Sequence, residues 1–191
     1  PQGQVLFDTL YRSAGHDAFD KIILAADGSL LIAGCKNGAE NIWLSRRQFH
    51  KVLMENNRRD RHFGRLLHLS EDESSGQIRM AGAPKRNESA WTLQWDEQLV
   101  PVGEHFYEDM TRSEPVFLDF ASSNSLHVIG HTWSKGNDDI WLAHLFSDAG
   151  SRSESIVGTR NPEYVRAAAR LSPNRYVLSM SALARSVGEL H

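Results

Sequence analysis

The sequence predicts an all-β protein, a four-bladed β-propeller with blades of about 48 residues, and three observations support this fold class. Gly34, Gly82 and Gly130 each close a short apolar run, and they follow one another at intervals of 48 residues. A tryptophan follows these glycines after nine, nine and eleven residues, at positions 43, 91 and 141. Turn-forming residues separate the apolar runs. A repeat of this length made of short strands is typical of a propeller, in which each repeat forms one four-stranded blade.

The first repeat is expected to contain four strands joined by tight turns. Its strands are predicted at residues 19–25, 30–34, 41–45 and 51–55. Asp27 and Gly28 separate the first two strands. An Asp-Gly pair between apolar runs is a strong hairpin signal, because glycine accepts a positive φ. We expect the repeat glycine at the end of the second strand to allow a bulge or a close approach of the neighbouring backbone.

The next three repeats follow the same plan. The second has predicted strands at residues 65–70, 77–82, 90–94 and 100–104, and the third at 116–121, 126–131, 139–144 and 154–157. The fourth begins with strands at 164–171 and 176–181 and stops within its third strand. We therefore expect one propeller domain over residues 1–191, with repeats at about 14–60, 61–110, 111–160, and 161–191 together with 1–13.

The N-terminal residues are expected to complete the last blade. Residues 1–7 are similar to the turn and outer strand of a blade, and a strand added there would cover an otherwise open sheet edge. Two alternatives stay open at this point. The four blades could be half of a larger ring, completed by a second chain or by further residues. The segments 164–171 and 181–190 are rich in alanine, leucine and arginine and could instead form helices.

The composition is that of an ordinary globular protein and argues against two classes of function. Apolar residues make up 40% of the 191 residues, charged residues make up 24%, and the formal net charge is −3. A nucleic-acid-binding domain usually carries a clear basic excess, so nucleic acid is not an expected partner. No apolar run reaches the roughly 18 residues that a membrane-spanning helix needs. Cys35 is the only cysteine, which excludes an internal disulfide, and we expect it to be a small buried residue.

Two repeats carry a longer shared pattern. In the first repeat it comprises Gly15, Asp17, Ile22, Asp27, Gly28, Leu31, Ile32, Ala33, Gly34, Asn41, Trp43 and Leu44. In the third repeat it comprises Gly130, Thr132, Ser134, Gly136, Asp139, Trp141 and Leu142. This pattern resembles the repeat of bacterial extracytoplasmic β-propellers. The second and fourth repeats depart from it, because Arg61 replaces an acidic residue and the fourth lacks both the glycine and the tryptophan. The resemblance implies a propeller fold and a periplasmic or secreted location, with the cytoplasm as the alternative, and it implies no particular reaction.

Charged and aromatic residues outside the repeat pattern are the candidates for binding. Asp119 stands in an otherwise apolar strand, and we expect it to form an ion pair with Arg166 or Arg170 beside the central channel. The basic stretch 56–62 is expected in a loop on one rim, near Arg46 and Arg47. This loop would either dock an acidic partner or a carboxylated glycan, or simply be solvated. Trp95 and Trp133 lie outside the repeat pattern, and Trp133, in the loop between Gly130 and Gly136, is the one expected to be exposed, either as a contact residue or as an anchor of that loop. The candidate binding residues are Arg58, Arg59, Arg61, Asp119, Trp133, Arg166 and Arg170.

No motif for catalysis or metal binding stands out. His127 and His131 are four residues apart, which on a strand places them on one face but ~13 Å apart, too far to share one ion. The sequence has no zinc-finger spacing, no phosphate-binding loop and no serine-nucleophile elbow. The polar residues expected on the innermost strands, where side chains could converge, are Asp20, Lys21 and His68 together with Asp119, Arg166 and Arg170. We therefore expect no catalytic residue, no metal and no cofactor.

The sequence favours a non-catalytic binding propeller that holds a protein or a glycan at one rim. A first alternative is an assembly module that completes a larger ring by forming a homodimer. A second is a small hydrolase that uses Asp119 and neighbouring channel residues. A second carboxylate close to Asp119 would favour the hydrolase, and an arginine held against Asp119 would weaken it.

Overall fold

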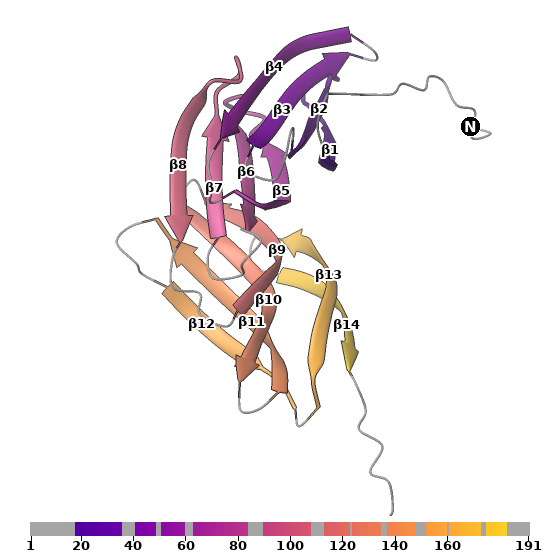
Figure 1. Ribbon diagram of the computed structural model, residues 1–191, viewed down its shortest axis with the longest axis vertical. Helices are drawn as coiled ribbons and strands as arrows, with labels where there is room; N and C mark the ends of the chain where they lie inside the picture. The colour runs from indigo at the N-terminus through magenta and orange to yellow at the C-terminus, as the bar shows by residue number, and fades with distance from the viewer. Residues whose placement is uncertain are drawn as a thin grey trace, which may run out of the picture. The chain divides into compact units, whose positions relative to one another are not determined.

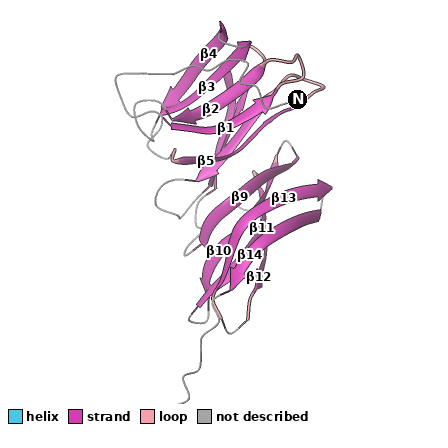
Figure 2. Cartoon of the chain, turned by 90° about the vertical axis from the view of Figure 1, so that its right-hand side faces the viewer, coloured by secondary structure: helices cyan, strands magenta, loops and turns pink. Residues whose placement is uncertain are grey.

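The protein is all-β in the residues that its structure describes. The computed structural model describes residues 18–35, 41–48, 51–59, 63–83, 90–107, 113–122, 124–134, 137–147, 152–159, 161–172 and 175–182. Over these ranges the chain forms fourteen strands, all paired antiparallel, and no helix (Figures 1 and 2). No helix able to cross a membrane is found in this part of the chain.

The first compact unit contains two sheets, each a simple meander of four consecutive strands (Figure 1). Sheet A comprises β1 (Ala18–Leu24), β2 (Leu30–Cys35), β3 (Asn41–Gln48) and β4 (Lys51–Arg59). Sheet B comprises β5 (Arg65–Glu71), β6 (Ile78–Ala83), β7 (Ala90–Trp95) and β8 (Pro101–Tyr107). The first strand of sheet B lies against β1 and β2 of sheet A. The boundary with the second unit falls near residue 105.

The second compact unit contains a third four-stranded meander and a hairpin. Sheet C comprises β9 (Ser113–Ser122), β10 (Ser125–Ser134), β11 (Asn137–Phe146) and β12 (Arg152–Val157). Sheet D comprises β13 (Glu163–Ser172) and β14 (Arg175–Ala182). The first strand of sheet D lies against β9, β10 and β11 of sheet C, so both units place the first strand of one sheet on the sheet that precedes it.

The strands expected within the described residues are all present, although several of their ends differ from the expected bounds. The segment 164–171 is a strand, so the helical alternative there is wrong. The fourth strand of sheet A runs to Arg59 instead of ending near residue 55, so the expected loop at 56–62 is wrong for its first four residues. The register explains this, because β3 continues to pair up to Asn41 opposite Arg59. The expected N-terminal strand at residues 1–7 and the segment 183–190 lie outside the described residues.

The first strand of each sheet contains a one-residue bulge at a matching place. The register skips Asp20, Leu67, Val116 and Arg166 in β1, β5, β9 and β13. Gly34, Gly82 and Gly130 pair with the residue just before the bulge. A side chain on these glycines would overlap a main-chain carbonyl oxygen of the first strand, from Ala18, Arg65 and Glu114 respectively. The expectation of a bulge and a close backbone approach at the repeat glycine is therefore confirmed.

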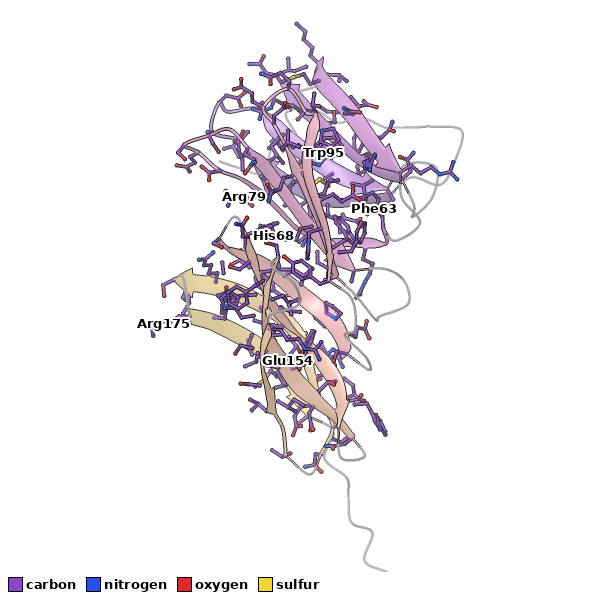
Figure 3. All side chains as sticks on the ribbon, turned by 90° about the vertical axis from the view of Figure 1, so that its left-hand side faces the viewer. Phe63, His68, Arg79, Trp95, Glu154 and Arg175 are labelled. Carbon is purple, nitrogen blue, oxygen red and sulfur yellow. The ribbon has the colours of Figure 1, made fainter. Side chains whose placement is uncertain are left out.

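The aromatic core follows the tryptophan pattern of the sequence. Trp43, Trp91 and Trp141 are 5%, 0% and 1% exposed. Trp95 is also fully buried in the first unit (Figure 3), and its indole Nε1 donates to the sulfur of Met80 at 3.1 Å. The remaining tryptophan, Trp133, is 53% exposed, so the expectation of an exposed ring at this position is confirmed.

A buried arginine joins the two sheets of the first unit. Arg46 is 6% exposed and donates to Asp27 at 2.9 Å and to Glu71 at 2.6 Å. Glu71 also accepts from the main-chain N–H of Ala26 at 2.7 Å. The Asp27-Gly28 turn is thereby fixed to β5, and the positive φ of Gly28, +79°, is the one that its hairpin needs. Cys35 is buried, with its sulfur 3.4 Å from the carbonyl oxygen of Gly64.

Candidate functional site

Asp119 is held by two side chains of sheet D. Its carboxylate accepts from the guanidinium of Arg170 at 3.0 Å and from the hydroxyl of Tyr176 at 3.1 Å. Arg170 also donates to the main-chain carbonyl of Phe120 at 3.0 Å. The Asp119 side chain is 9% exposed and that of Arg170 is 32% exposed. The ion pair expected from the sequence is therefore present, with Arg170 as the partner.

A row of polar side chains crosses sheet C next to this ion pair. Asp119, His127, His144 and Ser153 stand opposite one another on the four successive strands β9 to β12. Directly opposite residues of antiparallel strands share one face of the sheet. The rings of His127 and His144 are in edge contact, with centroids 4.5 Å apart, and the ring of Phe146 lies against His144 at 4.2 Å.

Tyr176 connects the carboxylate of this row to its first imidazole. The hydroxyl of Tyr176 is 2.7 Å from Nδ1 of His127. Because a hydroxyl has one proton and Tyr176 donates it to Asp119, Nδ1 of His127 carries a hydrogen and donates to Tyr176. Burial and the nearby Asp119 raise the pKa of Tyr176 to about 12, so it remains a donor at neutral pH. Burial, and then the neighbouring His144, lower the pKa of His127, which favours the neutral ring.

A groove of about 620 Å³ lies on this face of the second unit. It is lined by Tyr176 and Leu178 of sheet D and by Ser153 and Ser155 of β12. The remaining lining residues come from β10 and β11: His127, Val128, Ile129, Leu142, Ala143 and His144. The lining is mostly apolar, with hydroxyl and imidazole groups and no Asp, Glu, Lys or Arg. Nε2 of His144 is buried and has no hydrogen-bond partner.

A second cluster surrounds the exposed tryptophan at the end of β10. Trp133 stands opposite Asp138 in the β10–β11 hairpin. The carboxylate of Asp138 accepts from the hydroxyl of Tyr164 at 2.9 Å, and this hydrogen bond raises the pKa of Tyr164. The guanidinium of Arg166 lies over the Tyr164 ring, 5.6 Å from its centroid. The structure thus places two candidate residues, Trp133 and Arg166, at the same end of the second unit. We call these four residues the Trp133 cluster.

The remaining candidates do not join either cluster. Arg58, on β4, forms an ion pair with Glu104 of β8 at 3.1 Å, and Arg59 is exposed at the end of the same strand. Arg61 lies outside the described residues. The expected proximity to Arg46 and Arg47 is wrong, because these two pair with Met54 and Val52 at the opposite end of the β3–β4 ladder.

The other residues expected on innermost strands, Asp20, Lys21 and His68, lie on β1 and β5 of the first unit. Asp20 occupies the bulge of β1, where burial raises the pKa of its carboxyl although the main chain of Leu66 donates to it. Lys21 follows on β1, and His68 lies on β5 of the first unit (Figure 3). Over the described ranges, no group of three or more His, Cys, Asp or Glu residues is arranged to hold a metal ion.

Sequence reasoning missed His144 and Tyr176. The spacing of His127 and His131 along one strand keeps these two rings apart, whereas the partner of His127 lies across the hairpin. The hairpin register offered the missing signal, since placing Gly130 opposite Trp141 also places His127 opposite His144. Tyr176 reaches Asp119 from another sheet, and that contact depends on how sheets C and D pack.

No protein-family model matches the chain, and no curated protein matches it either.

Proposed function

We propose that this protein is a non-catalytic binding module and that it holds a protein partner at the Trp133 cluster. The observation that carries the proposal is the 53% exposed side chain of Trp133, a large apolar ring near the end of β10. Trp, Tyr and Arg are the residues most enriched at the energetic centres of protein interfaces. The cluster contains one of each. Tyr164 donates a hydrogen bond to Asp138, the residue opposite Trp133, and Arg166 lies over the Tyr164 ring.

Binding measurements on a Trp133 variant test this proposal. The protein is used to capture a partner, the partner is purified, and its affinity is measured by calorimetry for the wild type and for Trp133→Ala. We expect Trp133→Ala to weaken binding roughly 10- to 30-fold, as for other hot-spot residues worth about 2 kcal/mol. The matched control is Val102→Ala, since Val102 is 55% exposed on β8 of the other unit. Equal affinity for Trp133→Ala and Val102→Ala would contradict the proposal. If the protein bound a glycan instead and Trp133→Ala abolished that binding, the site would stand and the ligand class would change from protein to glycan.

The surroundings of Asp119 favour binding over hydrolysis. A general acid or a nucleophile needs a carboxyl group that is free to exchange a proton or attack a substrate. Asp119 instead accepts from Arg170 and Tyr176, and Arg170 is further fixed to the carbonyl of Phe120. This is the arginine-held arrangement that weakens the hydrolase alternative.

We further propose that the four sheets are the blades of a β-propeller whose last blade is completed by the N-terminal strand. The four first strands share their bulge position, and three sheets are four-stranded meanders in chain order. Both properties are expected of propeller blades. An extracytoplasmic location, which the repeat pattern implies, is part of the same proposal.

The face of β1 supports closure of the ring. Three positions around each bulge, one before it and two and four after it, can be compared. In β5 these positions are Leu66, Leu69 and Glu71, and in β9 they are Pro115, Leu118 and Phe120. All of them are buried except Glu71, which is ion-paired. In β1 they are Phe19, Ile22 and Leu24, which are 49%, 60% and 72% exposed. Large apolar side chains on a regular strand face are usually covered, and closure against the last blade would cover them. Covering by a second chain is the assembly alternative.

A further inference from the structure

The side chain of Arg166 is held in place by two contacts within sheet D. Its Nε donates to Oγ of Ser181 on β14 at 3.0 Å, and its guanidinium lies over the ring of Tyr164 on β13, 5.6 Å from the centroid. Arg166 is nevertheless exposed. In the described part of the chain, no carboxylate pairs with it and no acceptor receives a hydrogen bond from its two terminal nitrogens. The guanidinium is therefore ordered while its charge and its outer N–H groups remain unpaired.

This combination differs from that of other arginines in the protein. A carboxylate lies within ion-pair distance of Arg46, Arg47, Arg58, Arg79, Arg152 and Arg170. Arg175, at the start of β14, is exposed, and no side-chain hydrogen bond, ion pair or ring contact to the described residues holds it (Figure 3). Arg175 has the properties of a solvated surface arginine, whereas Arg166 is fixed like a paired one.

A partner bound at the Trp133 cluster would take the water away from Arg166. The contacts of the cluster connect its tryptophan to its arginine. A protein interface of standard size covers about 800 Å² on each partner, which is enough for both side chains. Buried N–H groups and a buried charge cost free energy unless acceptors replace the lost water. Asp138 does not fill this role, because it accepts from the hydroxyl of Tyr164 and forms no ion pair with Arg166 in the described structure.

We propose that the protein partner presents an Asp or Glu carboxylate to the terminal nitrogens of Arg166, beside an apolar side chain that packs on Trp133. This inference rests on the proposed function and specifies the chemistry of the partner. A carboxylate can accept two parallel N–H···O bonds from a guanidinium and neutralise its charge. Because Ser181 and Tyr164 already order Arg166, less conformational entropy is lost when the pair forms.

Peptide selection tests this inference. A library of random peptides with free C-termini is selected on the full chain, and the selected peptides are synthesised. We expect these peptides to combine an Asp or Glu with a large apolar residue close by. Their affinities are then measured by fluorescence anisotropy. We expect Arg166→Gln to weaken binding about tenfold, and Arg166→Lys to retain part of the affinity, because lysine keeps the charge without the planar pair of donors.

Amide replacements in the peptide identify the group that Arg166 binds. Changing the acidic side chain of the peptide to its amide should lower its affinity for the wild type about tenfold and its affinity for Arg166→Gln much less. Amidation of the peptide C-terminus should have no effect. Arg175→Gln is the matched control, since it removes an exposed arginine from the same sheet, and it should bind the peptides as the wild type does.

The possible failures of this inference and of the proposed function are distinguishable. Selected peptides without Asp or Glu, or an unchanged affinity in Arg166→Gln, would overturn the inference. The proposed function would stand in that case if Trp133→Ala still weakened binding. An effect of C-terminal amidation in place of the side-chain amide would overturn the assignment to Asp or Glu. If Trp133→Ala bound the peptides as tightly as the wild type, the proposed function would fail and the inference would fail with it.

Discussion

Asp119 shows how a charged residue is accommodated within an apolar strand. Burying a carboxylate is costly unless its oxygen atoms are paired, and here Arg170 and Tyr176 both donate to Oδ2. The sequence was sufficient to single out Asp119 and to offer Arg166 and Arg170 as partners. Choosing between them required the register, because the bulge at Arg166 turns that side chain toward Ser181 and Tyr164.

The imidazole of His127 makes stability depend on pH. Its pKa is lowered in the folded protein, mainly by burial and then by His144, with Asp119 opposing and Arg170 adding to the effect. A histidine whose folded pKa is depressed binds a proton more readily in the unfolded chain. Its contribution to stability is therefore fully present above its unfolded pKa of about 6.5 and is lost as the pH falls below that value.

We expect the urea midpoint of the wild type to fall between pH 7 and pH 5. His127→Gln should reduce this pH dependence, because it removes one group that must be neutral in the folded state. His105→Gln, on β8 of the other unit, is measured alongside it as a second variant that lacks one imidazole. If the urea midpoint of His127→Gln changed with pH as much as that of the wild type, the prediction for His127 would be contradicted.

The hairpin with a bulge in its first strand is the element that recurs in this protein. Each bulge brings a carbonyl of the first strand against the second strand, and a glycine accommodates it in the first three sheets. In the fourth, Met180 pairs with Val165 just before the bulge at Arg166. The sequence signal at Gly34, Gly82 and Gly130 therefore had a physical cause. The same signal could not show that the fourth hairpin keeps this geometry without glycine.

Replacing one of these glycines tests the element directly. In Gly130→Ala the new methyl group would overlap the carbonyl oxygen of Glu114, and a main-chain atom cannot move aside as a flexible side chain can. We expect a loss of about 2–3 kcal/mol in the free energy of unfolding, at the upper end of overpacking effects. Gly103→Ala is the matched control, since its methyl group would meet only side-chain atoms of Gln94, at ordinary contact distances. Equal stability of the two variants would contradict this account of the repeat glycine.

At the scale of the whole molecule, the regular spacing of short apolar runs was enough to predict the strands. The residue at which β4 ends could not be predicted from the local sequence. Asn56 and Asn57 are typical of loops, yet they continue to pair with Leu44 and Trp43. Nor could the local sequence reveal the groove, whose lining residues come from sheets C and D and meet only through the packing of these sheets. The chain order of the strands within each sheet, by contrast, followed directly from the short turns between them.

We propose that the protein is a propeller of four blades closed within one chain. The most direct test is the mass of the protein in solution, measured by light scattering over a range of concentrations. A closed ring predicts a monomer of 21.5 kDa at every concentration, because the apolar face of β1 is covered by the chain itself. A stable dimer would contradict closure within the chain and would show that a second copy covers Phe19, Ile22 and Leu24.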